Sequence, residues 1–216
     1  MKPSSHIADR RRPSTEDRAI ADSTVRRYRD PHFDAIGVKV LPGEHYVTQS
    51  SDEMIVTVLG SCVAACIRDP VARVGGMNHF MLPENEIGAW GEASSSLRYG
   101  NFAMERLIND ILKLGGRRSR FEIKLFGGAN VLSIGASIGR KNCEFIEAYL
   151  AAEGLPITAQ HLYGEHPRRV HYFPGTGKVF MLELRRQKEI EGMKVEESYR
   201  ETLKKAPVTG SIELFE

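Results

Sequence analysis

The chain has 216 residues, of which 41% are hydrophobic and 27% charged; this is the composition of a soluble globular protein with one domain-sized core. Its formal net charge of +2 is nearly balanced, so bulk electrostatics give no reason to expect nucleic-acid binding beyond a local patch. We expect neither membrane insertion nor a signal peptide, because no segment has the roughly 18–20 apolar residues of a span and the N-terminus lacks an apolar core.

Residues 1 to about 35 are polar and rich in Arg, Asp and Ser, without sustained periodicity. We expect a disordered N-terminal extension here, the alternative being a short docking helix around Glu16–Tyr28. From Ile36 onward, apolar and β-branched runs alternate with turn residues such as Pro42-Gly43, which predicts strands. The predicted strands cover residues 36–49 with a turn in the middle, 54–59, 63–69 and 73–82.

Helices enter the predicted pattern only in the second half of the chain. Residues 83–96 are expected to form a polar loop, followed by helices over 97–114 and 142–154, the latter with Asn142 as its N-cap. Further strands are predicted over 121–129 and 156–164, with a hairpin over 168–184, and residues 187–216 form a charged helix or tail. Strands first and alternation later predict an α+β or layered α/β domain, in which helices cover a mixed sheet.

Cys62 follows Gly60-Ser61 between two predicted strands. Because Gly60 permits a tight bend, a thiol there could be exposed for attack on a carbonyl, with backbone N–H groups holding the oxyanion. A thiol with a pKa of about 8.5 also needs a neighbouring base or cation. The alternative interpretation is a small buried hydrophobic side chain.

His79 is the candidate base, because an antiparallel return of the chain would bring it beside the turn that holds Cys62. Met77 and Met81 flank His79 on the same face of the predicted strand. Their apolar side chains would lower the pKa of the imidazole, whereas an adjacent thiolate would raise it. The alternative is a core histidine bonded to a backbone carbonyl.

The other two cysteines are interpreted as structural. Cys66 lies four residues beyond Cys62, which is about 13 Å along an extended strand, too far for a disulfide or a shared metal ion. Cys143 lies on the second predicted helix and is interpreted as a packing residue. Three cysteines, an odd number, also favour a reducing cytoplasm over a disulfide framework. We predict no metal site and no nucleotide site, since the glycine-rich stretches lack P-loop spacing.

Several stretches resemble the chemoreceptor glutamine deamidases, the CheD family of bacterial chemotaxis. The resemblance covers most of residues 36–216, and it is carried by VTVLGSCVAACIRDPVARVGGMNHFMLP, LRYGNFAMERLINDILKLGG, KLFGGANVL, IGRKNCEFIEAYL, VHYFPGTGKVFMLEL and GSIELF. It implies a layered α/β sandwich similar to cysteine-dependent deamidase toxins, with a catalytic domain over 36–186. The Cys-His-Thr set of the family falls on Cys62, His79 and Thr57, with Val56 as the alternative register for the third member.

The resemblance implies a cytoplasmic enzyme without cofactors, in which Cys62 attacks a glutamine carboxamide of a methyl-accepting chemotaxis receptor and the amides near Gly60 and Ser61 hold the oxyanion. A CheC-type phosphatase is a second implied partner. Surface residues implied near the mouth of the site are Tyr99, Asn101 and Phe126. Two alternatives stay open: a non-catalytic adaptor that binds receptor or phosphatase, and a thiol-dependent receptor methylesterase.

Overall fold

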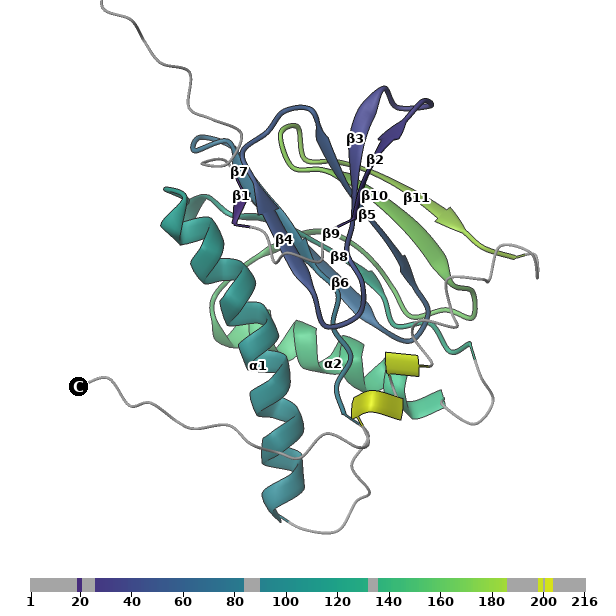
Figure 1. Ribbon diagram of the computed structural model, residues 1–216. Helices are drawn as coiled ribbons and strands as arrows, with labels where there is room; N and C mark the ends of the chain where they lie inside the picture. The colour runs from purple at the N-terminus through teal and green to yellow at the C-terminus, as the bar shows by residue number, and fades with distance from the viewer. Residues whose placement is uncertain are drawn as a thin grey trace, which may run out of the picture.

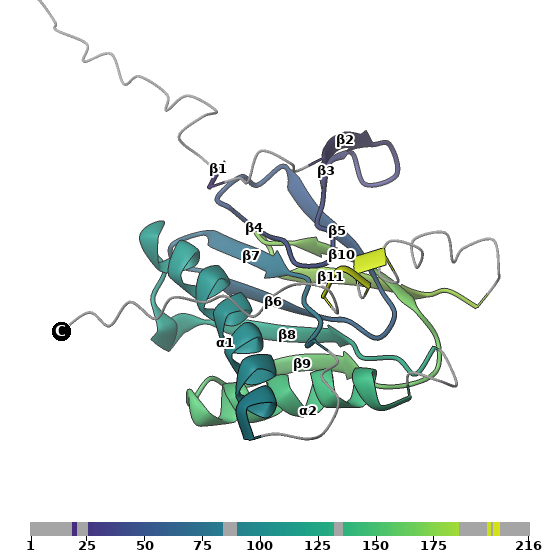
Figure 2. The ribbon, with the colours of Figure 1, turned by 60° about the horizontal axis from the view of Figure 1, so that its bottom comes forward.

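The computed structural model describes residues 19–20, 26–83, 90–131, 136–185, 198–199 and 201–203. They form two β-sheets packed face to face, with two helices on the outer face of the first sheet (Figures 1 and 2). Sheet A has the strand order β1 (Ala19–Ile20), β4 (His45–Thr48), β7 (Val74–Asn78), β6 (Val63–Asp69), β8 (Glu122–Gly127) and β9 (Ile157–Leu162). Sheet B has the order β11 (Lys178–Glu183), β10 (Arg168–Phe173), β5 (Glu53–Leu59), β3 (Ala35–Lys39) and β2 (Arg26–Asp30).

Both sheets are mixed. The pairs β3–β5 and β8–β9 are parallel, and the other pairs are antiparallel. The helices are α1 (Trp90–Lys113) and α2 (Ala136–Ala152), with a short 3-10 helix η2 (Arg118–Arg120) between them. The predicted layered α/β sandwich with mixed sheets covered by helices is therefore confirmed.

The core has two main layers, and β6 contributes to both. Val63, Ala65 and Ile67 point toward α1 and α2, whereas Ala64 and Cys66 point toward sheet B. This alternation follows from the two-residue period of a strand. Because β6 is covered on both faces, its sequence is a nearly continuous apolar run.

The predicted strands at 54–59 and 63–69 and the hairpin over 168–184 are confirmed. Two helix boundaries differ from the prediction. Helix α1 begins at Trp90, inside the segment expected to be a polar loop. Helix α2 begins at Ala136, so Asn142 is an internal, buried residue and not the N-cap. None of the helices among the described residues is both long and apolar enough to cross a membrane.

The N-terminal extension was expected to reach residue 35, but residues 26–30 form strand β2, which pairs with β3. Two contacts explain this strand. The ring of Tyr28 fills the space over Gly37, where a Cβ would lie 2.5 Å from the ring, and Arg27 donates a hydrogen bond to Tyr46. The alternative helix around Glu16–Tyr28 is wrong for residues 26–28; the other residues before 26, apart from 19–20, lie outside the described part.

Candidate functional site

Cys62 lies in the short connection between β5 and β6. Three successive carbonyl groups of this connection accept hydrogen bonds from the same side of the turn. The donors belong to the segment after β8 and to α2: Ala129 N–H bonds Gly60 O at 2.7 Å, Asn142 Nδ2 bonds Ser61 O at 2.9 Å, and Gly128 N–H bonds Cys62 O at 2.7 Å. No described peptide bond is cis. In a trans peptide the carbonyl and the following N–H point in opposite directions, so the N–H groups of Ser61 and Cys62 point away from these donors.

An isolated antiparallel bridge brings His79 to the same side of the chain as Cys62. Val63 and Phe80 exchange backbone hydrogen bonds of 3.0 and 2.9 Å, which places them opposite each other. Phe80 and Val63 face the helices, so Cys62 and His79, one residue away on each strand, face the other sheet. The two residues are diagonal neighbours, at about 7–8 Å between backbones, a separation that long side chains bridge.

Thr57 on β5 fixes the orientation of the imidazole. Its hydroxyl donates to Val40 O at 2.8 Å and lies 2.7 Å from His79 Nδ1. Because the hydroxyl proton is used for Val40, the Thr57 oxygen accepts from Nδ1–H. The basic lone pair of the neutral imidazole is then on Nε2. Thr57 faces the imidazole, whereas Val56, the alternative register, belongs to a small cluster with Ala35 and Met54.

The backbone of His79 is held by the loop before β4. Gly43 N–H donates to His79 O at 2.7 Å, and His79 N–H donates to Glu44 O at 2.9 Å. Met77 and Met81, the flanking residues predicted to desolvate the imidazole, are both buried in the layer between the sheets. Burial lowers the pKa of His79 to about 3, so the imidazole is neutral at physiological pH.

Both central side chains are buried, with exposed fractions of 0% for Cys62 and 2% for His79. The expectation that the turn exposes the thiol is therefore wrong for this structure. The reason is tertiary: Cys62 belongs to the apolar layer between the sheets, and Tyr199 and Leu203 from the C-terminal part of the chain pack against that layer.

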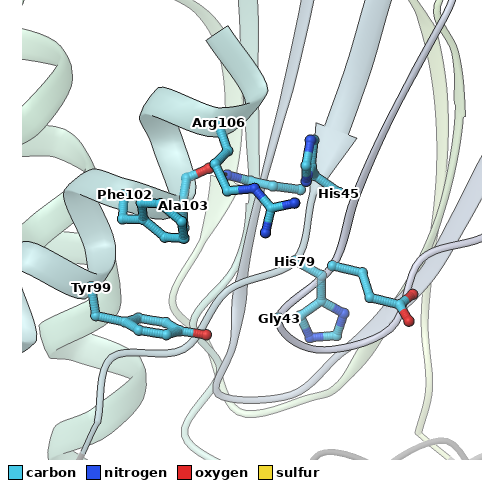
Figure 3. Close-up of a pocket in the computed structure, with 9 residues that line it drawn as sticks. Gly43, His45, His79, Tyr99, Phe102, Ala103 and Arg106 are labelled. Atoms are coloured by element: carbon cyan, nitrogen blue, oxygen red, sulfur yellow. The ribbon is translucent and has the colours of Figure 1, made fainter. Parts of the chain in front are cut away.

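A cavity of about 180 Å³ lies beside His79, between α1 and the Gly43 loop. Figure 3 shows Tyr99, Phe102 and Arg106 of α1 on one side, facing His45, His79 and Gly43 on the other. Phe102, which lines this cavity, is 56% exposed, so one wall of the cavity lies at the surface of α1.

The structure separates the three residues that were predicted to lie near the mouth of the site. Tyr99 lines the cavity. Asn101 is exposed on α1 and is not among the residues that line the cavity. Phe126 is buried in the layer between the sheets, so its assignment to a surface is wrong: β8 is an inner strand of sheet A, and its alternate side chains point inward.

None of the three cysteines forms a disulfide. Burial raises the pKa of the Cys66 thiol far above its usual range and that of Cys143 to about 11. Cys143 packs in the layer between helices and sheet A, which confirms its interpretation as a packing residue. Among the residues that the structure describes, no group of three His, Cys, Asp or Glu side chains is placed to hold a metal ion.

Two residues that shape this site have roles that the sequence pattern did not predict. Asn142 accepts a hydrogen bond from Leu82 N–H at 2.8 Å and donates to Ser61 O. It therefore links α2 to the turn that holds Cys62 and to the segment that follows His79. Its position before a predicted helix suggested an N-cap, and no local signal distinguishes the two roles. Tyr199 was missed because its charged surroundings give no periodic apolar pattern.

Comparisons with known proteins show the family to which this chain belongs. A family model described as "CheD chemotactic sensory transduction" matches residues 81–183. A Rhodopseudomonas palustris (strain BisA53) protein named "Probable chemoreceptor glutamine deamidase CheD" is 60% identical over 99% of this chain and 98% of its own length. This chain belongs to the CheD family.

Two further CheD relatives carry the same printed name. The protein from Xanthomonas campestris pv. campestris (strain B100) is 50% identical over 92% of this chain and 98% of its own. The protein from Saccharophagus degradans is 50% identical over 89% of this chain and 91% of its own. A solved Neisseria meningitidis structure, titled with the family DUF152, aligns with a TM-score of 0.30 at 12% identity over 56% of this chain and 52% of its own. A score that low carries no argument.

Proposed function

We propose that this protein is a chemoreceptor glutamine deamidase, which hydrolyses glutamine side chains of methyl-accepting chemotaxis receptors to glutamate through a Cys62 thioester. The observation that carries the proposal is the nearly full-length match, at 60% identity, to a CheD relative of that printed name. The hydrogen bond between Thr57 and His79 supports the chemistry, because it places the basic lone pair of the imidazole on Nε2.

In the first step, His79 Nε2 takes the proton of Cys62 as the sulfur attacks the carboxamide carbon, forming a C–S bond and a tetrahedral oxyanion. The imidazolium then gives that proton to the departing amide nitrogen, and the C–N bond breaks to release ammonia and a thioester. Water attacks the thioester with His79 again as base, and the sulfur leaves as the thiol. The products are glutamate and ammonia, and the enzyme is regenerated.

The N–H groups of Ser61 and Cys62 are the proposed oxyanion donors. Support comes from the three hydrogen bonds that hold the carbonyls of the turn from the opposite direction. Donors fixed in this way need no reorganisation when charge develops on the substrate oxygen. The reaction requires no cofactor or metal beyond these groups.

The proposed products and partners follow from the same chemistry. Each deamidation replaces a neutral amide by a carboxylate, which adds negative charge to the receptor and creates a glutamate that can be methylated. Receptors are therefore the proposed substrates, and a CheC-type phosphatase remains a predicted regulatory partner. Cytoplasmic location remains a prediction.

The test is mass spectrometry of a purified receptor cytoplasmic fragment incubated with four forms of the protein: wild type, Cys62→Ala, His79→Gln and Cys66→Ala. Cys66 is the matched control, because it is equally buried, in the strand β6 that follows Cys62, but lies outside the proposed site. We expect amide-to-acid conversion with wild type and Cys66→Ala and background conversion with the other two.

Equal, background-level conversion by all four forms would contradict the enzyme and favour the adaptor. Methanol release from a methylated receptor without ammonia release from the unmethylated one would favour the methylesterase. The two volatile products therefore distinguish the alternatives on matched substrates.

A further inference from the structure

We infer that the helical residues 198–199 and 201–203, here named the C-terminal cover, close the Cys62 site and must be displaced before a protein glutamine reaches the sulfur. The inference extends the proposed function to its regulation and rests on it only for the identity of the substrate. The cover lies about 140 residues from Cys62 along the chain, by the numbering of the sequence, and its position is set by tertiary contacts.

Tyr199 and Leu203 are the apolar contacts of the cover. Both side chains are partly buried against the layer between the sheets, and Cys62, Val40 and Met81 belong to that layer. The short helical piece, yellow in Figures 1 and 2, therefore packs against the main domain. Thr202, whose hydroxyl bonds Ser198 O at 3.0 Å, is exposed.

Tyr199 meets two residues that surround the candidate site. Its hydroxyl group forms a hydrogen bond with the hydroxyl of Tyr99 on α1. Its ring also lies over Gly43, where a Cβ would be 2.4 Å from the Tyr199 hydroxyl oxygen. Gly43 in turn donates a backbone hydrogen bond to His79. Tyr199 therefore bridges α1 and the loop that holds the imidazole.

Two observations place the tyrosine pair close to the sulfur. Tyr199 packs against the apolar layer that contains Cys62. Gly43 and Tyr99, which contact Tyr199, also line the cavity beside His79. Tyr199 therefore adjoins that cavity, and truncation of the Tyr199 side chain would extend the cavity toward the thiol.

The energetics suit a cover that opens. Two partly buried apolar side chains and a hydrogen bond between neutral hydroxyls are among the contacts that hold it, and each contributes little compared with a fully buried core side chain. A substrate that buries a comparable apolar surface can compete with the cover, because both would occupy the same space beside Tyr99 and Gly43.

The experiment measures site-resolved alkylation of the full-length protein by iodoacetamide, with mass spectrometry of each cysteine. We expect slow labelling of Cys62 in wild type and about tenfold faster labelling in Tyr199→Ala and in Leu203→Ala, because loss of a half-buried side chain weakens the closed state by about that factor. Thr202→Ala is the matched control, since its side chain is exposed in the same helical piece; its labelling should equal that of wild type.

Cys66 and Cys143 report on the integrity of the core in the same sample, because both are fully buried. They should stay unlabelled in every variant. Faster labelling of all three cysteines together would assign the segment to global folding and overturn the inference. Labelling of Cys62 in wild type that is as fast as in the variants would also overturn the inference. Tyr199→Phe keeps the ring and loses only the hydrogen bond, so it should give a smaller increase in a protein that keeps its packing.

Deamidation is assayed separately, so that the two proposals can fail independently. Faster Cys62 labelling in the cover variants, without deamidation by any form, would support the inference about the cover and contradict the proposed deamidase activity. Deamidation by wild type, with unchanged Cys62 labelling in both cover variants, would support the proposed deamidase activity and contradict the inference that the cover closes the site.

Discussion

Thr57 shows how one hydroxyl group can define the protonation state of a site. It donates its proton to Val40 O and is left with lone pairs only for His79. The imidazole must therefore carry its proton on Nδ1, and Nε2 is the basic atom. In the proposed mechanism, a threonine bonded to a backbone carbonyl takes the orienting role that a carboxylate has in a Ser-His-Asp triad, without placing a negative charge in a buried site.

Replacing Thr57 by valine tests this assignment, because valine keeps the shape of threonine but cannot bond either partner. We expect Thr57→Val to lower the free energy of unfolding by about 1–3 kcal/mol, the cost of leaving buried polar groups unpaired. Deamidation should slow by about 100-fold, the lower end of what a positioned general base contributes. Urea unfolding and initial rates on the receptor fragment measure the two effects. Thr57→Ser keeps the hydroxyl and should retain most activity; equal loss in both variants would contradict the role of the hydroxyl.

At the scale of elements, the Cys62 turn is positioned by the junction between β8 and α2 and not by its own strands alone. Gly127, the last residue of β8, pairs with Val63 and has φ of +117°. Its Cβ, if present, would lie 2.1 Å from Cys62 O. Glycine is required there because the backbone of one strand approaches the turn of the other.

Gly127→Ala should therefore displace the turn that holds the sulfur. We expect a loss of unfolding free energy that exceeds that of Gly154→Ala by about 2 kcal/mol or more, together with a large loss of deamidation. Gly154 is the matched control: its φ is also positive, at +64°, but no atom lies within 4 Å of its Cβ position. Gly154→Ala thus reports the conformational strain alone, about 1–2 kcal/mol. Equal destabilisation in the two variants would show that the contact with Cys62 is unimportant.

At the scale of the whole molecule, the sandwich buries titratable groups at both ends of β6. Near one end, burial lowers the pKa of His79 to about 3. At the other end, Asp69 is fully buried and accepts hydrogen bonds from Arg120 and from backbone N–H groups. Burial alone would raise the pKa of Asp69, but these bonds outweigh it and lower the pKa to about 2.

These values predict how stability depends on pH. Between pH 6.5 and about 3, the unfolded chain binds a proton at His79 that the folded protein does not, so the free energy of unfolding falls as pH falls, by up to about 1.4 kcal/mol per pH unit. Asp69 adds a loss only below about pH 4, its ordinary range. Circular dichroism during urea unfolding, at several pH values between 4.5 and 7, measures the slope.

The control for this prediction is His79→Gln, which has no titrating group at the position. Its unfolding free energy should change less with pH over the same interval, because the remaining histidines and carboxylates are shared with wild type. Identical slopes in the two proteins would show that His79 titrates normally and is not desolvated.

Much of the fold could be predicted because its signals are local. The short apolar run at residues 63–69, bounded by turn residues, predicted strand β6, and the turn residues at 174–177 predicted the hairpin of β10 and β11. The proximity of Cys62 and His79 was also predictable, because adjacent antiparallel segments joined by a short turn return beside each other. By contrast, the start of α1 at Trp90 differs from the prediction because the Ser and Gly residues in 91–96 have weak helix propensity.

The sequence by itself determined the order of the strands along the chain, the place of the thiol at a turn and the pairing of that turn with a histidine, since each depends on residues close together along the chain. Only the tertiary structure decided that the thiol is buried, that Asn142 holds its turn and that Tyr199 packs beside it. Asn142 is 81 residues from Ser61 along the chain, and Tyr199 is 137 residues from Cys62 (199 − 62). Their partners are selected by the packing of whole layers, which no local pattern encodes.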